Sequence, residues 1–394
     1  MVSTEFSLEA VRAATPGVDN VIHVNNAGAA LPPSVVTDTV VDYLRREEAI
    51  GGYETADERH DQLEAVYDSL GALVGAPREH MAVIENATRA WDMAIYGYPF
   101  ERGDRVVTCR AEYSSNVLAF LQLERRFGIE MVLIDDDEHG QIDLAHLDAE
   151  LTRGAAMVAM THIPTSGGLI NPAEDVGALC REHGVFFVLD ACQSAGQVPL
   201  DVGTIGCDVL SGTGRKYLRG PRGTGFLYVS ERALDVLEPP FIDLHAADWT
   251  RVDDYDWRPD ARRFENWETY YAGKAGLGAA VDYALGVGIE TTSVRIADLA
   301  ARLRNGLGSL DRVAVHDKGA RRGGIVTFTV DGVDATSVHA QLLARRINTS
   351  TSGPDRARLD LEPRGLPTVI RASTHYYNSE DEIDAVIAAV DEVR

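Results

Sequence analysis

One lysine stands in a glycine-rich stretch, SGTGRKYLRGPRGTG (residues 211–225), of a chain that uses very few lysines. The 37 basic residues include only three lysines, Lys216, Lys274 and Lys318. Lysine can lose its proton and form a Schiff base with an aldehyde, whereas the guanidinium group of arginine stays protonated. The glycines allow the chain to turn tightly around a phosphate, and Arg215 can neutralise that phosphate. The stretch therefore predicts that Lys216 holds an aldehyde next to a phosphate group.

An aspartate, Asp190, ends the apolar run FFVLDACQSAGQ (residues 186–197), and a second run, CDVLSG, separates it from Lys216. Taken alone, Asp190 is as readily interpreted as a helix cap. Two neighbouring strands of one sheet, however, bring the aspartate and the lysine to the same edge. An aspartate near a Schiff-base lysine is what pyridoxal phosphate requires, because it keeps the pyridine nitrogen protonated and the ring electron-withdrawing. The pair predicts a pyridoxal 5'-phosphate site.

Three further motifs supply the other parts of such a site. ENATRAW (residues 85–91) follows the run MAVI and opens a helix, where Asn86 or Thr88 could bind a phosphate or simply cap the helix. Tyr113, in AEYSSN, could lie flat on a cofactor ring, although half-buried tyrosines at strand ends are common. Arg371, in VIRASTHYYN, could bind the α-carboxylate of an amino acid or form a structural ion pair. Their order along the chain is more informative than any one of them.

The elements that must position these residues follow an α/β pattern. Seven apolar runs are predicted to be strands: MAVI, DRVVTC, IEMVLID, AAMVAMTHI, GVFFVLDA, CDVLSG and GFLYV. Helical patterns such as SNVLAFLQLERRFG and PAEDVGALCREHG lie between them. This alternation predicts a mostly parallel sheet covered by helices, with ligands at the carboxyl ends of the strands.

The pattern changes after about residue 235. A loop rich in Asp and Trp (HAADWTRVDDYDW) precedes a long helix (YYAGKAGLGAAVDYALGVG), and shorter helices and strands follow. We therefore expect a large cofactor-binding domain at residues 21–240, a connecting loop and long helix at 241–285, and a smaller α+β domain at 286–394. Residues 1–20 are expected to pack on the small domain.

Composition excludes several classes of function. The chain has a net charge of -24 and a pI of about 4.8, which argues against binding to nucleic acid or to an anionic membrane. There is no apolar run of about 18 residues and no leader-like N-terminus, so a cytoplasmic protein is expected. The four cysteines fit no metal motif and predict no disulfide framework: Cys109, Cys180, Cys192 and Cys207.

These motifs, in this order, resemble the aminotransferase class V family of fold type I pyridoxal phosphate enzymes. The resemblance runs from HVNNAGAALPP (residues 23–33) to RASTHYYNSEDEID (residues 371–384). GRKYLRGPRGTGFLYV and EEAIGGYE are similar to the branch that holds isopenicillin N epimerase-like proteins, selenocysteine lyase and desulfurase relatives, and the ergothioneine-pathway C–S lyase.

The resemblance implies a role for each matching residue. Lys216 would hold the cofactor and move the Cα proton, Asp190 would pair with the pyridine nitrogen, and Tyr113 would stack on the ring. Gln193 would lie near the phenolic oxygen. The phosphate would be surrounded by Ala87, Thr88, Thr213 and Arg215, and the substrate by Asn26, Ala29 and Arg371. A homodimer with shared active sites is implied, in which Thr269 of RFENWET (residues 263–269) reaches the neighbouring phosphate site.

The sequence departs from the resemblance in two places. Desulfurases carry a nucleophilic cysteine shortly before the carboxylate arginine, but INTSTSGPDRARLDLEPRGLPTVIRAS (residues 347–373) contains none. Many relatives also have an asparagine near the position of Thr165. Cys192 is expected to be packed rather than reactive, and Lys274 and Lys318 are expected at the surface.

The absent cysteine favours β-elimination from a cysteine-derived amino acid, a C–S lyase reaction that needs no protein thiol. An epimerase or racemase, with Tyr113 or His23 as the second acid, and an aminotransferase are the alternatives. A binding module without catalysis is not favoured, because Lys216 and Asp190 are both present.

Overall fold

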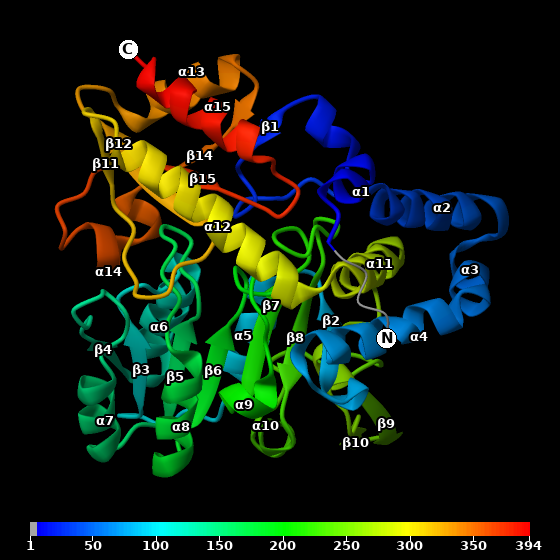
Figure 1. Cartoon of the computed structure of the whole chain (residues 1–394). Coiled ribbons are helices and arrows are strands. Elements are labelled where there is room, and N and C mark those ends of the chain that lie inside the picture. The colour runs from blue at the N-terminus through cyan, green and yellow to red at the C-terminus, as the bar shows by residue number, and fades with distance from the viewer. Residues whose placement is uncertain (1–5) are drawn as a thin grey trace.

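The computed structural model, which describes residues 6–394, is built around a seven-stranded sheet of order β2-β8-β7-β6-β5-β3-β4 (Figure 1). The strands are β2 (Met81–Ile84), β3 (Arg105–Cys109), β4 (Glu130–Ile134), β5 (Met157–Thr161), β6 (Phe186–Asp190), β7 (Val209–Thr213) and β8 (Gly225–Val229). The strands from β7 to β4 pair in parallel, and β8 pairs antiparallel with both β2 and β7. All seven predicted runs form this sheet, and the predicted α/β class is confirmed.

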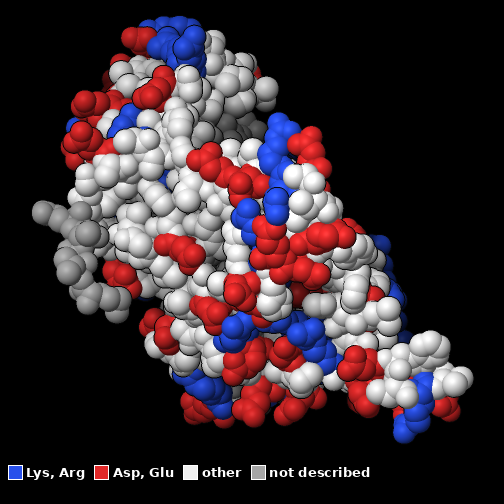
Figure 2. Space-filling model, turned by 90° about the vertical axis from the view of Figure 1, so that its right-hand side faces the viewer, with Lys and Arg blue, Asp and Glu red and all other residues white. Residues whose placement is uncertain are grey.

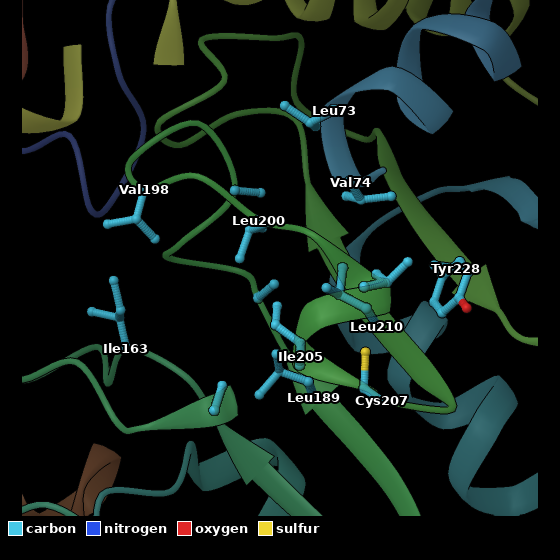
Figure 3. Close-up of a cluster of buried hydrophobic side chains, with 14 of the residues drawn as sticks. Leu73, Val74, Ile163, Leu189, Val198, Leu200, Ile205, Cys207, Leu210 and Tyr228 are labelled. Atoms are coloured by element: carbon cyan, nitrogen blue, oxygen red, sulfur yellow. The ribbon is translucent and has the colours of Figure 1, made fainter. Parts of the chain in front are cut away.

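Helices cover both faces of the sheet. They include α5 (Ala87–Gly97), α6 (Ser114–Phe127), α7 (Leu144–Thr152), α8 (Ala173–His183), α9 (Val202–Ile205) and α10 (Glu231–Val236). Successive strand residues point to opposite faces, so Val188 packs in the core with Trp91 and Phe120, whereas Leu189 packs in the other core. Figure 3 shows part of this second core, where Leu189 and Leu210 lie near Ile205. Burial on both faces explains why these strands read as continuous apolar runs.

A helical layer lies beside the β2 edge of the sheet. It consists of α2 (Ser34–Ile50), α3 (Gly52–Glu58), α4 (His60–Val74) and α11 (Tyr271–Val287). A Cβ atom at Gly276 would lie 2.5 Å from a methyl group of Val40, and one at Gly278 would lie 2.8 Å from a methyl group of Val66. The glycines of α11 therefore allow α2 and α4 to approach it closely.

The C-terminal part contains a four-stranded antiparallel sheet of order β11-β12-β15-β14. Its strands are β11 (Val313–Val315), β12 (Ile325–Val330), β14 (Ser350–Ser352) and β15 (Val369–Ser373). Its helices are α12 (Ile289–Gly308), α13 (Ala335–Ala344), α14 (Arg358–Leu361) and α15 (Glu380–Asp391). Leu303, Phe328 and Val386 belong to a separate core cluster between these elements.

The N-terminal segment contacts this C-terminal part. Strand β1 (Ile22–His23) pairs in parallel with β13 (Ile347–Asn348). In α1 (Leu8–Ala13), Arg12 forms an ion pair of 2.8 Å with Glu382 of α15. Residues 1–5 of the segment that we expect on the small domain lie outside the described residues.

Two expectations about the surface are wrong, and a third, for Lys318, holds in part. The predicted loop at residues 245–257 contains a hairpin, β9 (Ala247–Arg251) and β10 (Asp254–Trp257), in which bulky residues alternate with aspartates as in a strand. Lys274 is buried because α11 turns it toward α4, where its Nζ donates to the Tyr67 hydroxyl at 2.7 Å. Lys318 is only partly exposed, since its Nζ lies 2.7 Å from carboxylates of both Asp136 and Asp360.

Figure 2 shows acidic and basic side chains interspersed on the face that carries α2, α3 and α4. Within residues 6–394, no helix combines the length and the apolar character that crossing a membrane requires.

Candidate active site

A cavity of about 170 Å³ lies where β5, β6 and β7 end, at Thr161, Asp190 and Thr213. Parallel strands end at one edge of a sheet, so residues distant in sequence meet there. The cavity brings together eight of the predicted residues: Ala87, Thr88, Tyr113, Asp190, Gln193, Thr213, Arg215 and Lys216. Its other lining residues are Asn86, Asn116, Thr161, Ile163, Thr165 and Cys192.

Lys216 follows β7 in a tight loop and is only 7% exposed. A Cβ at Gly214 would lie 2.3 Å from Thr224 Oγ1, and one at Gly220 would lie 3.2 Å from the Gly214 Cα, so the loop needs glycine at both positions. The Lys216 Nζ donates to the Cys192 Sγ at 3.2 Å. Because this thiol is its one hydrogen-bond partner within residues 6–394, the amine is available to a ligand in the cavity.

Asp190 is buried at the end of β6, and its two carboxylate oxygens accept different donors. The backbone N–H of Cys192 donates to Oδ1 at 2.8 Å, and the amide of Asn116 donates to Oδ2 at 3.1 Å. Burial raises the pKa of this carboxyl group, while the two hydrogen bonds and Lys216 act in the opposite direction. A cation placed against Asp190 would therefore stabilise its ionised form.

Glu112 and Asn116 are site residues that the sequence analysis missed. The Asn116 amide donates to Glu112 Oε1 at 2.8 Å as well as to Asp190, so it joins the two carboxyl groups. Glu112 also accepts hydrogen bonds from the backbone N–H groups of Tyr113 and Thr161. Burial raises the pKa of Glu112 to about 7. The available signal was the position of Asn116 in the first turn of α6, three residues after Tyr113 and on the same helical face.

The N-terminus of α5 forms another wall of the cavity. Asn86 caps the helix by accepting the N–H of Arg89 at 3.0 Å, and Ala87 and Thr88 occupy its first turn. Unpaired backbone N–H groups and the helix dipole at this position favour an anion. Arg215 also lines the cavity, and its guanidinium group donates to the Gly28 carbonyl.

Arg371 lies just behind the cavity wall and has no carboxylate partner within residues 6–394. Its guanidinium donates to Thr165 through Oγ1 at 2.8 Å and the carbonyl at 3.0 Å, and to Ser350 Oγ at 3.0 Å. Burial lowers the pKa of Arg371 to about 10. A buried cation held only by neutral groups is suited to bind an anionic ligand that replaces Thr165.

Besides Arg371, three predicted site residues lie outside the cavity wall. Asn26 is fully buried, and its amide donates to the Ser373 carbonyl at 2.7 Å while its Oδ1 accepts the Tyr377 hydroxyl. The Ala29 carbonyl is 2.9 Å from His23 Nε2. Thr269 lines a separate hollow on the same chain. Asn26 and Ala29 shape the segment next to Arg215 and do not line the cavity.

The residues of the cavity fit pyridoxal phosphate. Gln193 lines the cavity, and its Oε1 atom is buried without a hydrogen-bond partner in the described part of the chain. The pyridine N–H would supply the cation that buried Asp190 lacks, and the α5 N-terminus would receive the phosphate. No group of three or more His, Cys, Asp or Glu side chains within residues 6–394 could hold a metal ion.

Comparisons with known proteins agree with this assignment. The model of the aminotransferase class-V family matches residues 22–386. A probable cysteine desulfurase of Xylella fastidiosa (strain 9a5c) is 30% identical over 382 residues, which cover 95% of this chain and 91% of the relative. The apo structure of a cysteine desulfurase from Thermococcus onnurineus NA1 has a TM-score of 0.92 at 28% identity and covers 100% of this chain and 99% of its own.

Two structures of the cystine C–S lyase C-DES share the fold, each with a TM-score of 0.87. One carries glycine covalently linked to the pyridoxal phosphate cofactor, at 23% identity and covering 97% of this chain and 99% of its own. The other holds the reaction product cysteine persulfide, at 24% identity and covering 96% and 99%.

Proposed function

Since this chain belongs to the aminotransferase class V family of fold type I pyridoxal phosphate enzymes, we propose that it is a C–S lyase for a cysteine-derived amino acid. The proposed reaction removes the Cα proton and expels the sulfur group from Cβ. The remaining three-carbon fragment ends as pyruvate and ammonia.

Lys216 is the proposed base. Bound pyridoxal phosphate supplies an aldehyde that binds amines covalently and a ring that withdraws electrons from Cα. The Lys216 amine would bind the cofactor in the resting enzyme and, once released by the substrate amine, take the Cα proton. Asp190, fixed by Asn116 and the Cys192 N–H, would keep the ring nitrogen protonated.

Arg371 is the proposed partner of the substrate carboxylate. It is buried, it lacks an acidic partner within residues 6–394, and its contact with Thr165 leads to the cavity. A carboxylate bound there would fix one end of the amino acid, so that the Cα–H bond points toward Lys216.

The observation that carries the lyase proposal is the composition of the segment before Arg371. Strand β14 presents Ser350 and Ser352 beside β15, and residues 347–373 contain no thiol. Ser352 Oγ lies 2.6 Å from Ser166 Oγ, which holds this segment against the large sheet's loops. No residue in this segment can accept sulfur from the substrate, and the one cysteine that lines the cavity, Cys192, contacts the proposed base Lys216. We therefore propose that the sulfur leaves as a small molecule.

Proton NMR in D2O tests the proposal. The enzyme is supplied with pyridoxal phosphate and then with cysteine, cystine, S-alkyl cysteine sulfoxides or sulfur-free amino acids. We expect pyruvate from sulfur-containing substrates only, and none from the Lys216→Ala variant. Stoichiometric alanine together with protein-bound persulfide would instead indicate desulfuration of the kind named for the relatives. Deuterium at Cα without pyruvate would indicate epimerisation or transamination.

We also propose a homodimer with shared active sites. Thr269 does not line the cavity of its own chain but borders a hollow with Glu85, Thr224 and Lys274. Large apolar side chains near it are exposed, including Trp267 at 53% and Leu244 at 71%. A second copy packed on this face would cover these side chains and bring Thr269 toward the partner's phosphate site.

A further inference from the structure

We propose that Cys192 and Lys216 form a peroxide-sensitive pair, in which oxidation of the thiol links the two side chains through a sulfur–nitrogen bond. The reaction would take place in the cofactor-free protein, with a hydroperoxide as the oxidant. It requires only a thiol and an amine in contact, so it stands apart from the reaction that the loaded enzyme catalyses.

The geometry of the pair distinguishes Cys192 from the other cysteines. Its Sγ accepts a hydrogen bond from Lys216 Nζ at 3.2 Å, and both residues line the same cavity. Cys109, Cys180 and Cys207 are buried in the apolar core, at 4% exposure or less. Cys192 is the one cysteine that is partly exposed, and all four are free thiols.

The cavity gives a small oxidant access to this thiol. It has room for a ligand, and both Cys192 and Lys216 line it.

The charges around the thiol have opposing effects. Burial has the largest effect and raises the pKa of Cys192 above its ordinary value, as does Asp190, whereas Lys216, through its charge and its hydrogen bond, and Arg215 act in the opposite direction. The thiol is therefore the predominant form at neutral pH, and the Lys216 ammonium group, when it holds no cofactor, favours the fraction that ionises. The thiolate is the form that attacks a peroxide.

The proposed chemistry balances in two steps. The Cys192 thiolate attacks the terminal peroxide oxygen and the O–O bond breaks, while the Lys216 ammonium group protonates the leaving oxygen. The sulfur is thereby oxidised to a sulfenic acid, the peroxide is reduced to water or an alcohol, and the amine is left neutral. The neutral Lys216 amine then attacks the sulfur and expels water, with no further change in oxidation state. The protein loses two hydrogen atoms in total, and the other three cysteines are too buried to compete for the sulfenic acid.

The link would consume the amine that binds the cofactor. Oxidised, cofactor-free protein would therefore fail to take up pyridoxal phosphate, and a thiol reductant would restore it. Conversely, cofactor bound to Lys216 would remove the amine from reach of the sulfur. The pair would prevent loading of the enzyme while peroxide is present.

Mass spectrometry tests the proposal on the full-length chain. Cofactor-free protein is treated with hydrogen peroxide, blocked with iodoacetamide and digested. We expect a peptide that joins Cys192 to Lys216, with an intact mass lower by two hydrogen atoms, and its loss on treatment with dithiothreitol. The same sample should regain the visible absorbance of bound pyridoxal phosphate only after reduction.

Matched variants separate the pair from general oxidation. Cys180→Ala should still form the link, whereas Cys192→Ala should not. Lys216→Arg keeps the positive charge but lacks a nucleophilic amine, so Cys192 should gain oxygen atoms and remain unlinked. Unmodified Cys192, or sulfinic acid in place of the link in the wild-type chain, would overturn the proposal. Equal linking in the presence of bound cofactor would also contradict it.

Discussion

At the scale of single residues, Asp190 illustrates how the site depends on its surroundings. Its burial disfavours a charge, yet two fixed donors, Asn116 and the Cys192 N–H, keep both oxygens oriented toward the cavity edge. The carboxylate is therefore positioned for a cationic partner before any ligand arrives. An asparagine at this position has nearly the same shape but no charge, so it tests the contribution of the charge alone.

Asp190→Asn should leave the cofactor bound but lower kcat by about 100-fold, since a charge-assisted hydrogen bond to the ring nitrogen contributes roughly 3 kcal/mol. Steady-state kinetics together with the absorbance of the bound cofactor measure this. Asp208→Asn is the matched control, because Asp208 is also buried but precedes β7 and contacts the Phe187 N–H, at the opposite edge of the sheet. Its kcat should be unchanged; an equal loss in both variants would remove Asp190 from the proposed role.

Glu112 gives the site a dependence on pH. Burial raises its pKa from 4.5 to about 7. Between these two pH values, the carboxyl group keeps its proton in the folded protein but loses it in the unfolded chain. Its contribution to folding is complete below pH 4.5 and is lost as the pH rises through 7. Glu112→Gln cannot ionise, so the stability of the wild type relative to this variant should fall by about 3 kcal/mol across that window. Urea unfolding of the cofactor-free chain measures it, and parallel pH curves would contradict it.

The sequence predicted the residues whose side chains would react with or bind the cofactor. It missed those that position other side chains. Lys216 and Asp190 were expected at one edge because both follow apolar strands. The contact of Asn116 with Asp190 spans 74 residues and depends on the pairing of three strands, which no local pattern reports. Cys192 was expected to be packed, but the turn after β6 directs it into the cavity, against Lys216.

At the scale of elements, the large sheet was predictable because each of its strands contains a short run of apolar residues, as in Met81–Ile84 and Phe186–Asp190. The β9–β10 hairpin was not, since its strands carry aspartates and exposed aromatic residues and have no core to pack on. The hairpin has the polar composition of a loop. Its alternation of bulky residues with aspartates is the pattern of a strand, but the many acidic residues make that pattern hard to recognise.

A buried ion pair holds α12 against β12 in the C-terminal sheet. Arg304 Nε lies 2.5 Å from Asp317 Oδ2, and Oδ1 accepts the Thr327 N–H at 2.8 Å. Asp317→Ala should lower the free energy of unfolding by about 3–5 kcal/mol, because it leaves a buried guanidinium without its partner. Glu48→Ala removes the exposed pair with Arg45 and should cost about 1 kcal/mol or less. Chemical denaturation compares the two, and equal effects would refute the assignment.

At the scale of the whole molecule, shared active sites make a prediction about mixed dimers. One chain carries Lys216→Ala and the other Thr269→Asp, which places a carboxylate where a phosphate is expected. If each site combines Lys216 of one chain with Thr269 of its partner, every mixed dimer has one intact site. Differently tagged chains, co-expressed and purified through both tags, should therefore regain activity.

Each homodimer of a single variant, purified in parallel, should be impaired. Mixed dimers with no more activity than the mean of the two homodimers would show that Thr269 serves only its own chain. A chain that is monomeric by analytical ultracentrifugation would refute the shared site altogether.

The pairing of the N-terminal segment with the C-terminal part has a consequence for synthesis. Asn26 is held by Ser373 and Tyr377, and β1 by β13, although more than 300 residues separate them (347 for Asn26 and Ser373). Chains emerge from the ribosome N-terminus first and fold domain by domain. The segment beside Arg215, residues 27–30, therefore reaches its final position only once the last strands have been translated. A nascent chain can assemble its large sheet early, but the segment beside Arg215 takes its final position only after β13 and β15 have been synthesised.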